Sequence, residues 1–317
     1  MTVLTVINSA MSGERKRPNI PVIVAFLIIY FVWGSTFLAI RIAVATVPPL
    51  FAAAVRFSVA GAALVGWSLI RGQPPPVRKQ WGSLIVLGVL MFCACYSALF
   101  WAQKFVDSGI TAVFQALIPV WTALIGIVLF QERLQKTLVA SIVLGITGVV
   151  LLASHQGFHG APLWPCLAIL GAEISWSLGT VLTQRLPLPE SKTMNAGWQM
   201  LLGGSMLFVC SATAGELRPF PTLSWSAAGS ILYLTVAGSL IAFTAYVWLL
   251  RRFPAPVVTS YAYVNPVIAL ALGHWLAQEV VDGRVVLGSS LVLGGVLLLM
   301  LPKTVQQDAK QTTASAH

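Results

Sequence analysis

The chain has 317 residues, of which 57% are hydrophobic and only 9% are charged. Soluble domains ordinarily carry about 25% charged residues, so this composition excludes an ordinary water-soluble core and predicts a protein embedded in lipid. The formal net charge is +10. It does not predict nucleic-acid binding, because the Lys and Arg residues lie in short loops and form no basic surface interleaved with aromatic residues.

In chain order, residues 1–19 form a polar tail and ten apolar runs follow. Each run is near the length that a transmembrane helix needs, about 20 residues. The runs are 20–42, 48–70, 81–105, 110–130, 138–154, 163–184, 195–213, 227–250, 256–276 and 285–301. We therefore expect an all-α membrane protein with ten transmembrane helices.

An internal repeat organises these runs. A shift of 143 residues places Trp33 on Trp176, and a shift of 147 residues places Pro119 on Pro266. Each copy holds five runs, at 20–154 and 163–301, and an odd number of spans makes the second copy enter the bilayer upside down. Two inverted five-helix repeats around a site at the membrane midplane are typical of transporters.

Basic loop residues set the expected orientation. Most of them lie on the side of both chain ends, and the exceptions are Arg41, Lys104, Arg218 and Arg284. By the positive-inside rule, the tails 1–19 and 302–317 are expected in the cytoplasm. The linker 155–162 between the repeats is then expected in the periplasm.

Two helical faces predict a central cavity. The first run carries Tyr30, Trp33, Phe37 and Arg41, and their mates in the sixth run are Glu173, Trp176, Thr180 and Gln184. Residues three or four apart share one face of a helix. Stripes that mix aromatic and polar groups suit a substrate cavity, and the alternative is interhelical packing with incidental polarity.

Two charged residues fall inside apolar runs. Glu173 is the only acidic residue well inside one. A carboxylate in lipid must be paired, solvated or protonated, so proton coupling and a structural partnership are both open. Arg56 could pair with Glu173, bind a substrate carboxylate, or extend toward the lipid headgroups, and we favour pairing or extension.

Prolines recur in the fourth and ninth runs. Gln115 precedes Pro119, and Asn265 precedes Pro266 and shares a face with Tyr261. A proline inside a helix frees a carbonyl of the preceding turn, which in lipid needs a partner from protein, water or substrate. The pair predicts a binding site or a hinge, with a plain packing kink as the alternative.

The same two runs each end in Gln-Glu, at Glu132 and Glu279. Inversion places these carboxylates on opposite membrane faces, where they could latch alternate gates or remain solvated. The sequence contains no GxxxxGK[ST], HExxH or GxSxG motif, so we predict no enzyme, no cofactor and no metal. Small residues at helical spacing, such as Ser141, Gly145 and Gly148, predict close helix packing.

Several stretches resemble the EamA-type members of the drug/metabolite transporter superfamily. They are Trp33-Gly34-Ser35-Thr36, Ile174-Ser175-Trp176, the run from Thr259 to Pro266, and the Pro119–Glu132 and Pro266–Glu279 pairs. The resemblance implies two EamA repeats with a cavity lined by spans 1, 3, 4, 6, 8 and 9. Carried over by position, the implied cavity residues are Trp33, Tyr96, Gln115, Trp176, Tyr246, Tyr263 and Asn265.

Members of this superfamily mostly export amino acids, other small metabolites or toxic compounds across a bacterial inner membrane. The sequence thus predicts a secondary transporter that exports a small metabolite, such as an amino acid, by alternating access. The alternatives are efflux of drugs or toxic compounds, and a passive facilitator or channel. The expected partners are the lipid bilayer and a small-molecule substrate, with proton coupling open, and no pattern specifies an oligomeric state.

Overall fold

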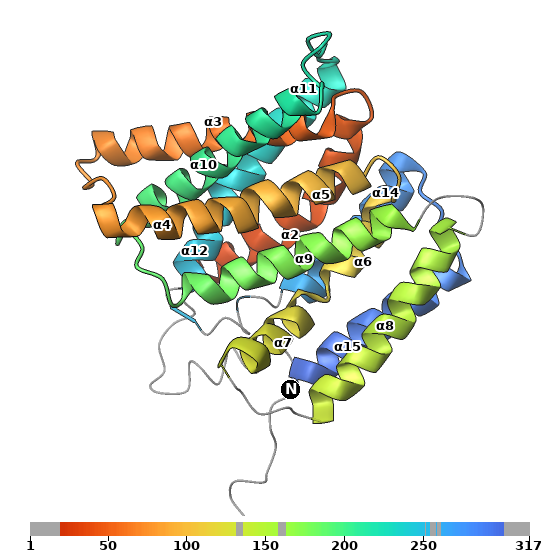
Figure 1. The fold of residues 1–317 in the computed structure, drawn as a ribbon. Coiled ribbons are helices and arrows are strands. Elements are labelled where there is room, and N and C mark those ends of the chain that lie inside the picture. The colour runs from red at the N-terminus through yellow and green to blue at the C-terminus, as the bar shows by residue number, and fades with distance from the viewer. Residues whose placement is uncertain are drawn as a thin grey trace, which may run out of the picture.

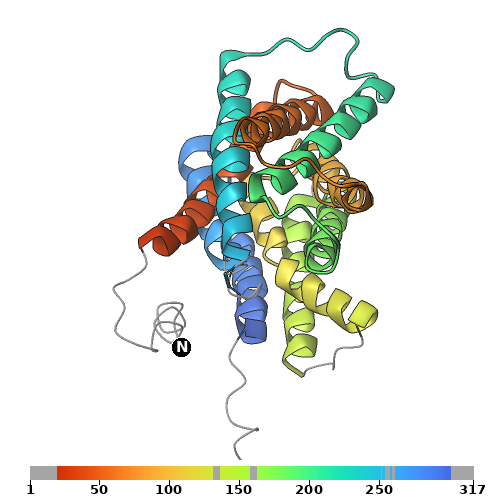
Figure 2. The same cartoon turned by 90° about the vertical axis from the view of Figure 1, so that its left-hand side faces the viewer.

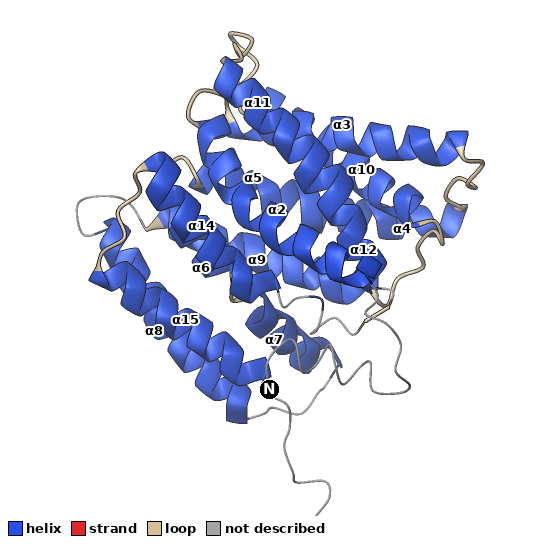
Figure 3. Ribbon diagram, turned by 180° about the vertical axis from the view of Figure 1, so that it is seen from behind, coloured by secondary structure: helices blue, strands red, loops and turns tan. Residues whose placement is uncertain are grey.

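The chain folds into a bundle of helices. The computed structural model describes residues 20–130, 136–157, 163–250, 252–253, 258 and 261–300. These residues form helices and loops without a strand (Figure 3). The helices shown in Figure 1 are α2 (Ile20–Val44), α3 (Pro49–Ile70), α4 (Arg78–Leu87), α5 (Cys95–Ala102), α6 (Ser108–Gln115), α7 (Ile118–Phe130), α8 (Lys136–Gly157), α9 (Trp164–Thr183), α10 (Lys192–Thr213), α11 (Trp225–Tyr233), α12 (Thr244–Leu250), α14 (Tyr261–Ala277) and α15 (Gly283–Met300).

Apolar length explains why these segments are helical. A backbone surrounded by lipid must satisfy its own hydrogen bonds, and a helix does so within one segment. Each predicted apolar run is helical over most of the residues that the structure describes, with a turn at residues 116–117 in the fourth run. Six helical segments are long and apolar enough to cross a membrane: Ile20–Val44, Pro49–Ile70, Arg78–Ala102, Ser108–Leu129, Trp164–Thr183 and Trp225–Leu250. Shorter apolar helices occupy Val139–Leu152, Val264–Ala277 and Gly283–Leu298.

Two of the long segments contain π-helical stretches. In the first repeat η1 (Gly88–Ala94) joins α4 to α5, and in the second η2 (Leu234–Phe243) joins α11 to α12. Figure 2 shows α11, η2 and α12 as one continuous column. The two stretches occupy equivalent places in the repeats. Because π-turns are rare and concentrate at functional sites, the side chains of these two stretches are candidates for a functional site.

Helix packing follows the repeat. The mates α3 and α10 pack against each other, and so do the mates α8 and α15. Helix α2 packs on α14 and on the α11–α12 segment, while its mate α9 packs on α7 and on α5. Exchanging the two repeats therefore reproduces these pairings, as a two-fold relation between them requires.

The direction of paired helices agrees with inversion. In the α3–α10 pair, Gly204 lies against Ser58 and Gly197 lies against Val65, so the two mates run antiparallel. The α8–α15 pair is equally close and appears as two adjacent helices in Figure 1. A Cβ added to Gly148 would lie 2.6 Å from the carbonyl oxygen of Gly288. The predicted close packing of small residues is thus confirmed for this pair.

Candidate functional site

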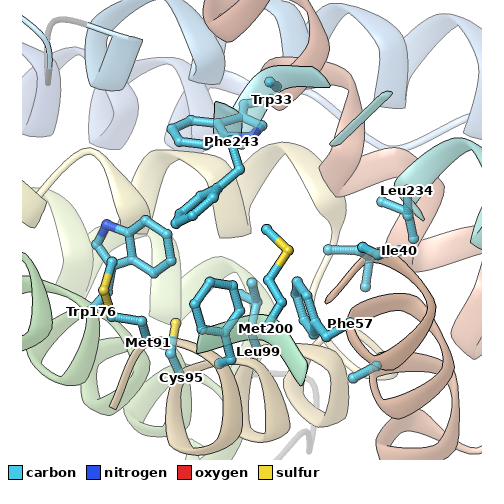
Figure 4. Packing of buried hydrophobic residues seen from close by; sticks show 14 of the residues in the cluster. Trp33, Ile40, Phe57, Met91, Cys95, Leu99, Trp176, Met200, Leu234 and Phe243 are labelled. Carbon is cyan, nitrogen blue, oxygen red and sulfur yellow. The ribbon is translucent and has the colours of Figure 1, made fainter. Parts of the chain in front are cut away.

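Aromatic side chains from both repeats meet inside the bundle. The set, which we call the aromatic cluster, comprises Trp33, Tyr96, Trp176, Phe243, Tyr246 and Tyr261. The ring centroid of Trp33 lies 4.8 Å from that of Tyr261, 5.0 Å from that of Tyr246 and 6.3 Å from that of Trp176. Trp33, Phe243 and Trp176 line one side of the packed core (Figure 4). Such contacts between tilted rings hold large apolar side chains in a fixed arrangement.

The π-helical stretches anchor this cluster. The indole nitrogen of Trp33 donates to the carbonyl oxygen of Gly238 in η2 at 3.1 Å. The next residue, Ser239, accepts from Nε of Arg56 at 2.9 Å. The mate of η2 leads directly into α5, which supplies Tyr96. The duplicated π-turns therefore position polar and aromatic groups at the meeting point of the repeats.

Two cavities flank the aromatic cluster. A small cavity of about 40 Å³ is lined by residues that include Trp33, Tyr96, Gln115, Trp176, Tyr261 and Asn265. A larger cavity of about 390 Å³, which we call the vestibule, is lined by residues that include Thr180, Gln184, Asn195, Gln199, Phe243 and Tyr246. Because Tyr246 contacts both Trp33 and Trp176, the rings of the cluster lie between the two cavities.

The end of the bundle opposite the vestibule is held closed by hydrogen bonds between segments, and we call it the latched end. Nη1 of Arg41 donates to the carbonyl oxygens of Gln103 at 2.8 Å and Val106 at 3.1 Å. Nη2 of the same side chain lies 3.3 Å from a carboxylate oxygen of Asp107. Arg41 thereby ties the end of α2 to the loop between α5 and α6.

Glu279 adds a second tie at the latched end. Its carboxylate accepts from the backbone nitrogen and the hydroxyl of Ser108 at 2.8 and 2.7 Å, and from the backbone nitrogen of Gly109 at 3.1 Å. These donors form the first turn of α6, where a negative charge is favourable. Glu216 likewise accepts from the backbone nitrogens of Leu50 and Phe51 at the start of α3.

Glu173 lies deep in the protein, beside the aromatic cluster. It is fully buried, and one carboxylate oxygen accepts from the indole nitrogen of Trp121 at 3.1 Å. The other carboxylate oxygen has no hydrogen-bond partner among the described residues. Glu173 lines neither cavity, and Trp176, which lines the small cavity, follows it by three residues on α9.

The favoured expectations for Arg56 were wrong. Its side chain is only 2% exposed, so it does not extend to the headgroups. Its guanidinium carbon lies 4.6 Å from the ring centroid of Phe57 and 5.1 Å from that of Tyr96. Within the described chain it pairs with no carboxylate, Glu173 included, and Nη1 has no hydrogen-bond partner. The interior position follows from the packing of α3 on η2, which encloses Arg56 between elements of both repeats.

The predicted cavity residues fall into four groups. Trp33, Tyr96, Gln115, Trp176 and Asn265 line the small cavity, and Thr180 and Tyr246 line the vestibule. Tyr30 and Glu173 line neither cavity. The carbonyl oxygen of Tyr30 accepts from the Asn265 amide at 2.9 Å when that amide nitrogen faces α2. The side chain of the predicted cavity residue Tyr263 lies outside the described residues, and so does the whole of the predicted gating residue Glu132.

The sequence prediction missed Tyr261. This residue is 5% exposed and packs against both Trp33 and Tyr246. A signal was present, because Tyr261 lies four residues before Asn265 and shares its helical face. No comparable signal marked Asn195 and Gln199, which line the vestibule from α10.

The paired prolines have different backbone surroundings. Residues 116–117 form a turn between α6 and α7, and Pro119 lies in the first turn of α7. The mates 263–264 lie inside α14, which continues through Pro266 without a break. A first-turn proline costs a helix no hydrogen bond, whereas an internal proline removes one. The two repeats thus share a sequence feature but differ in conformation.

Comparison with known proteins identifies the family to which the chain belongs. It matches the EamA-like transporter family over residues 20–154 and 163–301. It is 35% identical to the Escherichia coli strain K12 protein "Uncharacterized inner membrane transporter YedA", over 91% of this chain and 94% of that protein. It is 25% identical to the Salmonella typhimurium protein "Probable amino-acid metabolite efflux pump", over 90% and 96%. A crystal structure that is 22% identical has the same fold, with a TM-score of 0.61 over 87% of this chain and 95% of that one. The chain belongs to the EamA-like transporter family.

Proposed function

We propose that this protein is a secondary transporter of the bacterial inner membrane that exports a small amphipathic metabolite, such as an amino acid, by alternating access. The ten helical segments cross the membrane as two inverted repeats, 20–154 and 163–301. The segments 1–19 and 302–317 are cytoplasmic tails, and 155–162 is a periplasmic linker. The family, the name of the Escherichia coli relative and the two-fold packing support this arrangement.

The charge of the loops supports an orientation for the two ends of the bundle. The loops beside the vestibule carry basic residues that include Arg71, Arg78, Lys79, Arg185, Lys192 and Arg252, whereas the latched end has Arg41, Lys104, Arg218 and Arg284. By the positive-inside rule the vestibule then opens to the cytoplasm and the latched end faces the periplasm. The structure would be the state in which an exporter receives its substrate.

The observation that carries the proposal is the asymmetry across the aromatic cluster. A cavity of about 390 Å³ leads to the cluster from one end, and this is the size of typical small-molecule sites. Arg41 and Glu279 tie the other end shut. Because the repeats are inverted copies, exchanging their conformations would open the latched end and close the vestibule.

The chemistry of the lining suggests the substrate class. Aromatic rings offer apolar contact, while Gln115, Asn265 and Thr180 offer polar groups that would orient a ligand. An amino acid combines both requirements, and the name of the Salmonella typhimurium relative agrees with export of such compounds. Efflux of lipophilic toxic compounds remains the alternative, since the same rings would also bind an organic cation.

Counterflow in proteoliposomes tests the proposal. Vesicles holding purified protein are loaded with unlabelled L-leucine or L-phenylalanine, and entry of the labelled compound is followed. A carrier that alternates accumulates label transiently above equilibrium, whereas a channel only equilibrates it. Trp176→Ala should abolish this overshoot, while the control Trp225→Ala, at a residue 95% exposed, should preserve it. Equilibration without overshoot would refute alternating access, and accumulation of lipophilic cations alone would favour the efflux alternative.

A further inference from the structure

The inverted repeat relates the open vestibule to a closed counterpart at the latched end. Vestibule residues Thr180, Gln184 and Gln199 have the mates Phe37, Arg41 and Arg56, by the same shift that relates Trp176 to Trp33. Phe243 and Leu250 have the mates Tyr96 and Gln103, by the shift that relates Pro266 to Pro119. When the latched end opens, these five mates should line the outward cavity.

The structure already brings these mates together. Phe37 and Tyr96 line the small cavity. Arg41 donates to the carbonyl oxygen of Gln103, and the guanidinium of Arg56 lies 5.1 Å from the ring centroid of Tyr96. The small cavity of about 40 Å³ is therefore part of the collapsed counterpart of the vestibule.

Two of these mates, Gln103 and Arg56, have unmet hydrogen-bonding capacity, although neither lines the small cavity itself. Gln103 is fully buried, and neither of its side-chain amide atoms has a hydrogen-bond partner among the described residues. Nη1 of Arg56 is also buried and has no hydrogen-bond partner among the described residues. Buried polar groups are usually hydrogen-bonded, and each exception calls for an explanation, such as a ligand or ion that completes it.

The two cavities differ in charge. Where the vestibule has the neutral Gln199 and Gln184, the outward cavity would have the cations Arg56 and Arg41. Arg41 has the Asp107 carboxylate as its partner. Among the described residues, Arg56 contacts the Ser239 hydroxyl, the Phe57 ring and the Tyr96 side chain, and it meets no carboxylate. A charge buried without a counter-ion is costly, and inside a membrane it commonly marks a substrate path.

We propose that Arg56 binds a carboxylate group of the transported substrate, which places the substrate among small carboxylic acids with an apolar or aromatic body. The planar guanidinium offers paired donors that match a carboxylate. The neighbouring rings of Tyr96, Trp176 and Trp33 would hold the apolar body. This assignment rests on the transport function proposed above and narrows it to one class of ligand.

The test compares matched ligands on the full-length protein in lipid nanodiscs, with thermal stabilisation as the measure of binding. The probes are L-leucine, its amide, which lacks the carboxylate, and isocaproate, which lacks the amine. L-Phenylalanine, its amide and hydrocinnamate form a second set. For the wild-type protein, the amides should need at least about tenfold higher concentrations than the acids for half-saturation, as expected when a charge-assisted hydrogen bond is lost.

Arg56→Gln gives this position the residue of its repeat mate Gln199, so the substitution is compatible with the same fold. It should weaken binding of the acids about tenfold and leave binding of the amides unchanged. Arg56→Lys should retain part of the preference for acids. Arg284→Gln, at the same end of the protein, should change neither.

Equal binding of acids and amides by the wild-type protein would overturn the proposal without the use of any variant. Equal weakening of acids and amides by Arg56→Gln would show that Arg56 only packs against Phe57 and Tyr96. If none of the six compounds binds, the carboxylate class is wrong. Counterflow with lipophilic cations then decides separately whether the protein transports at all.

Discussion

The tie made by Glu279 predicts a measurable shift between the two access states. Glu279→Gln keeps one acceptor oxygen but replaces the other with an amide NH2 group. That group would face a backbone N–H at the start of α6, where Ser108 and Gly109 now donate to the carboxylate. Losing one charge-assisted hydrogen bond costs about 1.5–3 kcal/mol, which is a shift of at least about tenfold toward the state with the latched end open.

Labelling of single cysteines measures this shift. Thr180 lines the vestibule and its repeat mate Phe37 lines the small cavity, so each is replaced in turn by cysteine. The background lacks the four native cysteines, which are Cys93, Cys95, Cys166 and Cys210 and are free thiols. Glu279→Gln should slow maleimide labelling at position 180 and accelerate it at position 37.

Asp282→Asn is the matched control. The carboxylate of Asp282 lies in the same loop and caps α15 by accepting from the backbone nitrogens of Arg284 and Val285, so labelling should not change. Glu132→Gln, the repeat mate, should shift labelling in the opposite direction. Labelling that moves the same way in both Gln variants would refute the gating argument.

Three further predictions concern the interior. If Glu173 couples protons, Glu173→Gln should abolish the pH dependence of transport while substrate binding persists, whereas Glu190→Gln at the vestibule should preserve that dependence. An unchanged pH profile in Glu173→Gln would exclude the coupling role. Gly148→Leu should overpack the α8–α15 contact and lower the thermal unfolding midpoint, at a cost of about 1–3 kcal/mol of stability. Gly171→Leu is the control and should leave the midpoint unchanged, since a Cβ at Gly171 meets no atom within 4 Å. Equal midpoints for the two variants would contradict the close packing of α8 and α15. Trp33→Ala should destabilise the protein by about 3–5 kcal/mol, and a loss below 1 kcal/mol in chemical unfolding would show that the aromatic cluster is loosely packed.

Much of the fold could be predicted from the sequence because lipid imposes strong local rules. A run of about 20 apolar residues must be helical in a membrane, and the helical period places Trp33 and Trp176 on faces that the repeat makes equivalent. Small residues such as Gly148 predict close helix contacts because a residue without a bulky side chain lets two helix backbones approach each other. These features depend on residue type and spacing, which the sequence contains directly.

The surroundings of the candidate site residues depended on contacts between segments that are distant in the sequence. Nothing local to Arg56 distinguishes an arginine that reaches the headgroups from one enclosed between Phe57 and Tyr96, because its surroundings come from the second repeat as well. The different conformations around Pro119 and Pro266 likewise arise from one motif in two packing environments. The selection of Tyr261 as a cluster member follows from its contact with Trp33.

Composition, periodicity and the internal repeat thus determined by themselves that the chain is a helical membrane protein built from two related halves. They did so because solvent and helical geometry act on each segment separately. Only the tertiary structure decided which end holds the larger cavity, which carboxylate ties segments together at the other end, and which described charge is buried without a counter-ion. Those properties belong to the packing between helices, where related repeat sequences adopt different arrangements according to the sum of their long-range contacts.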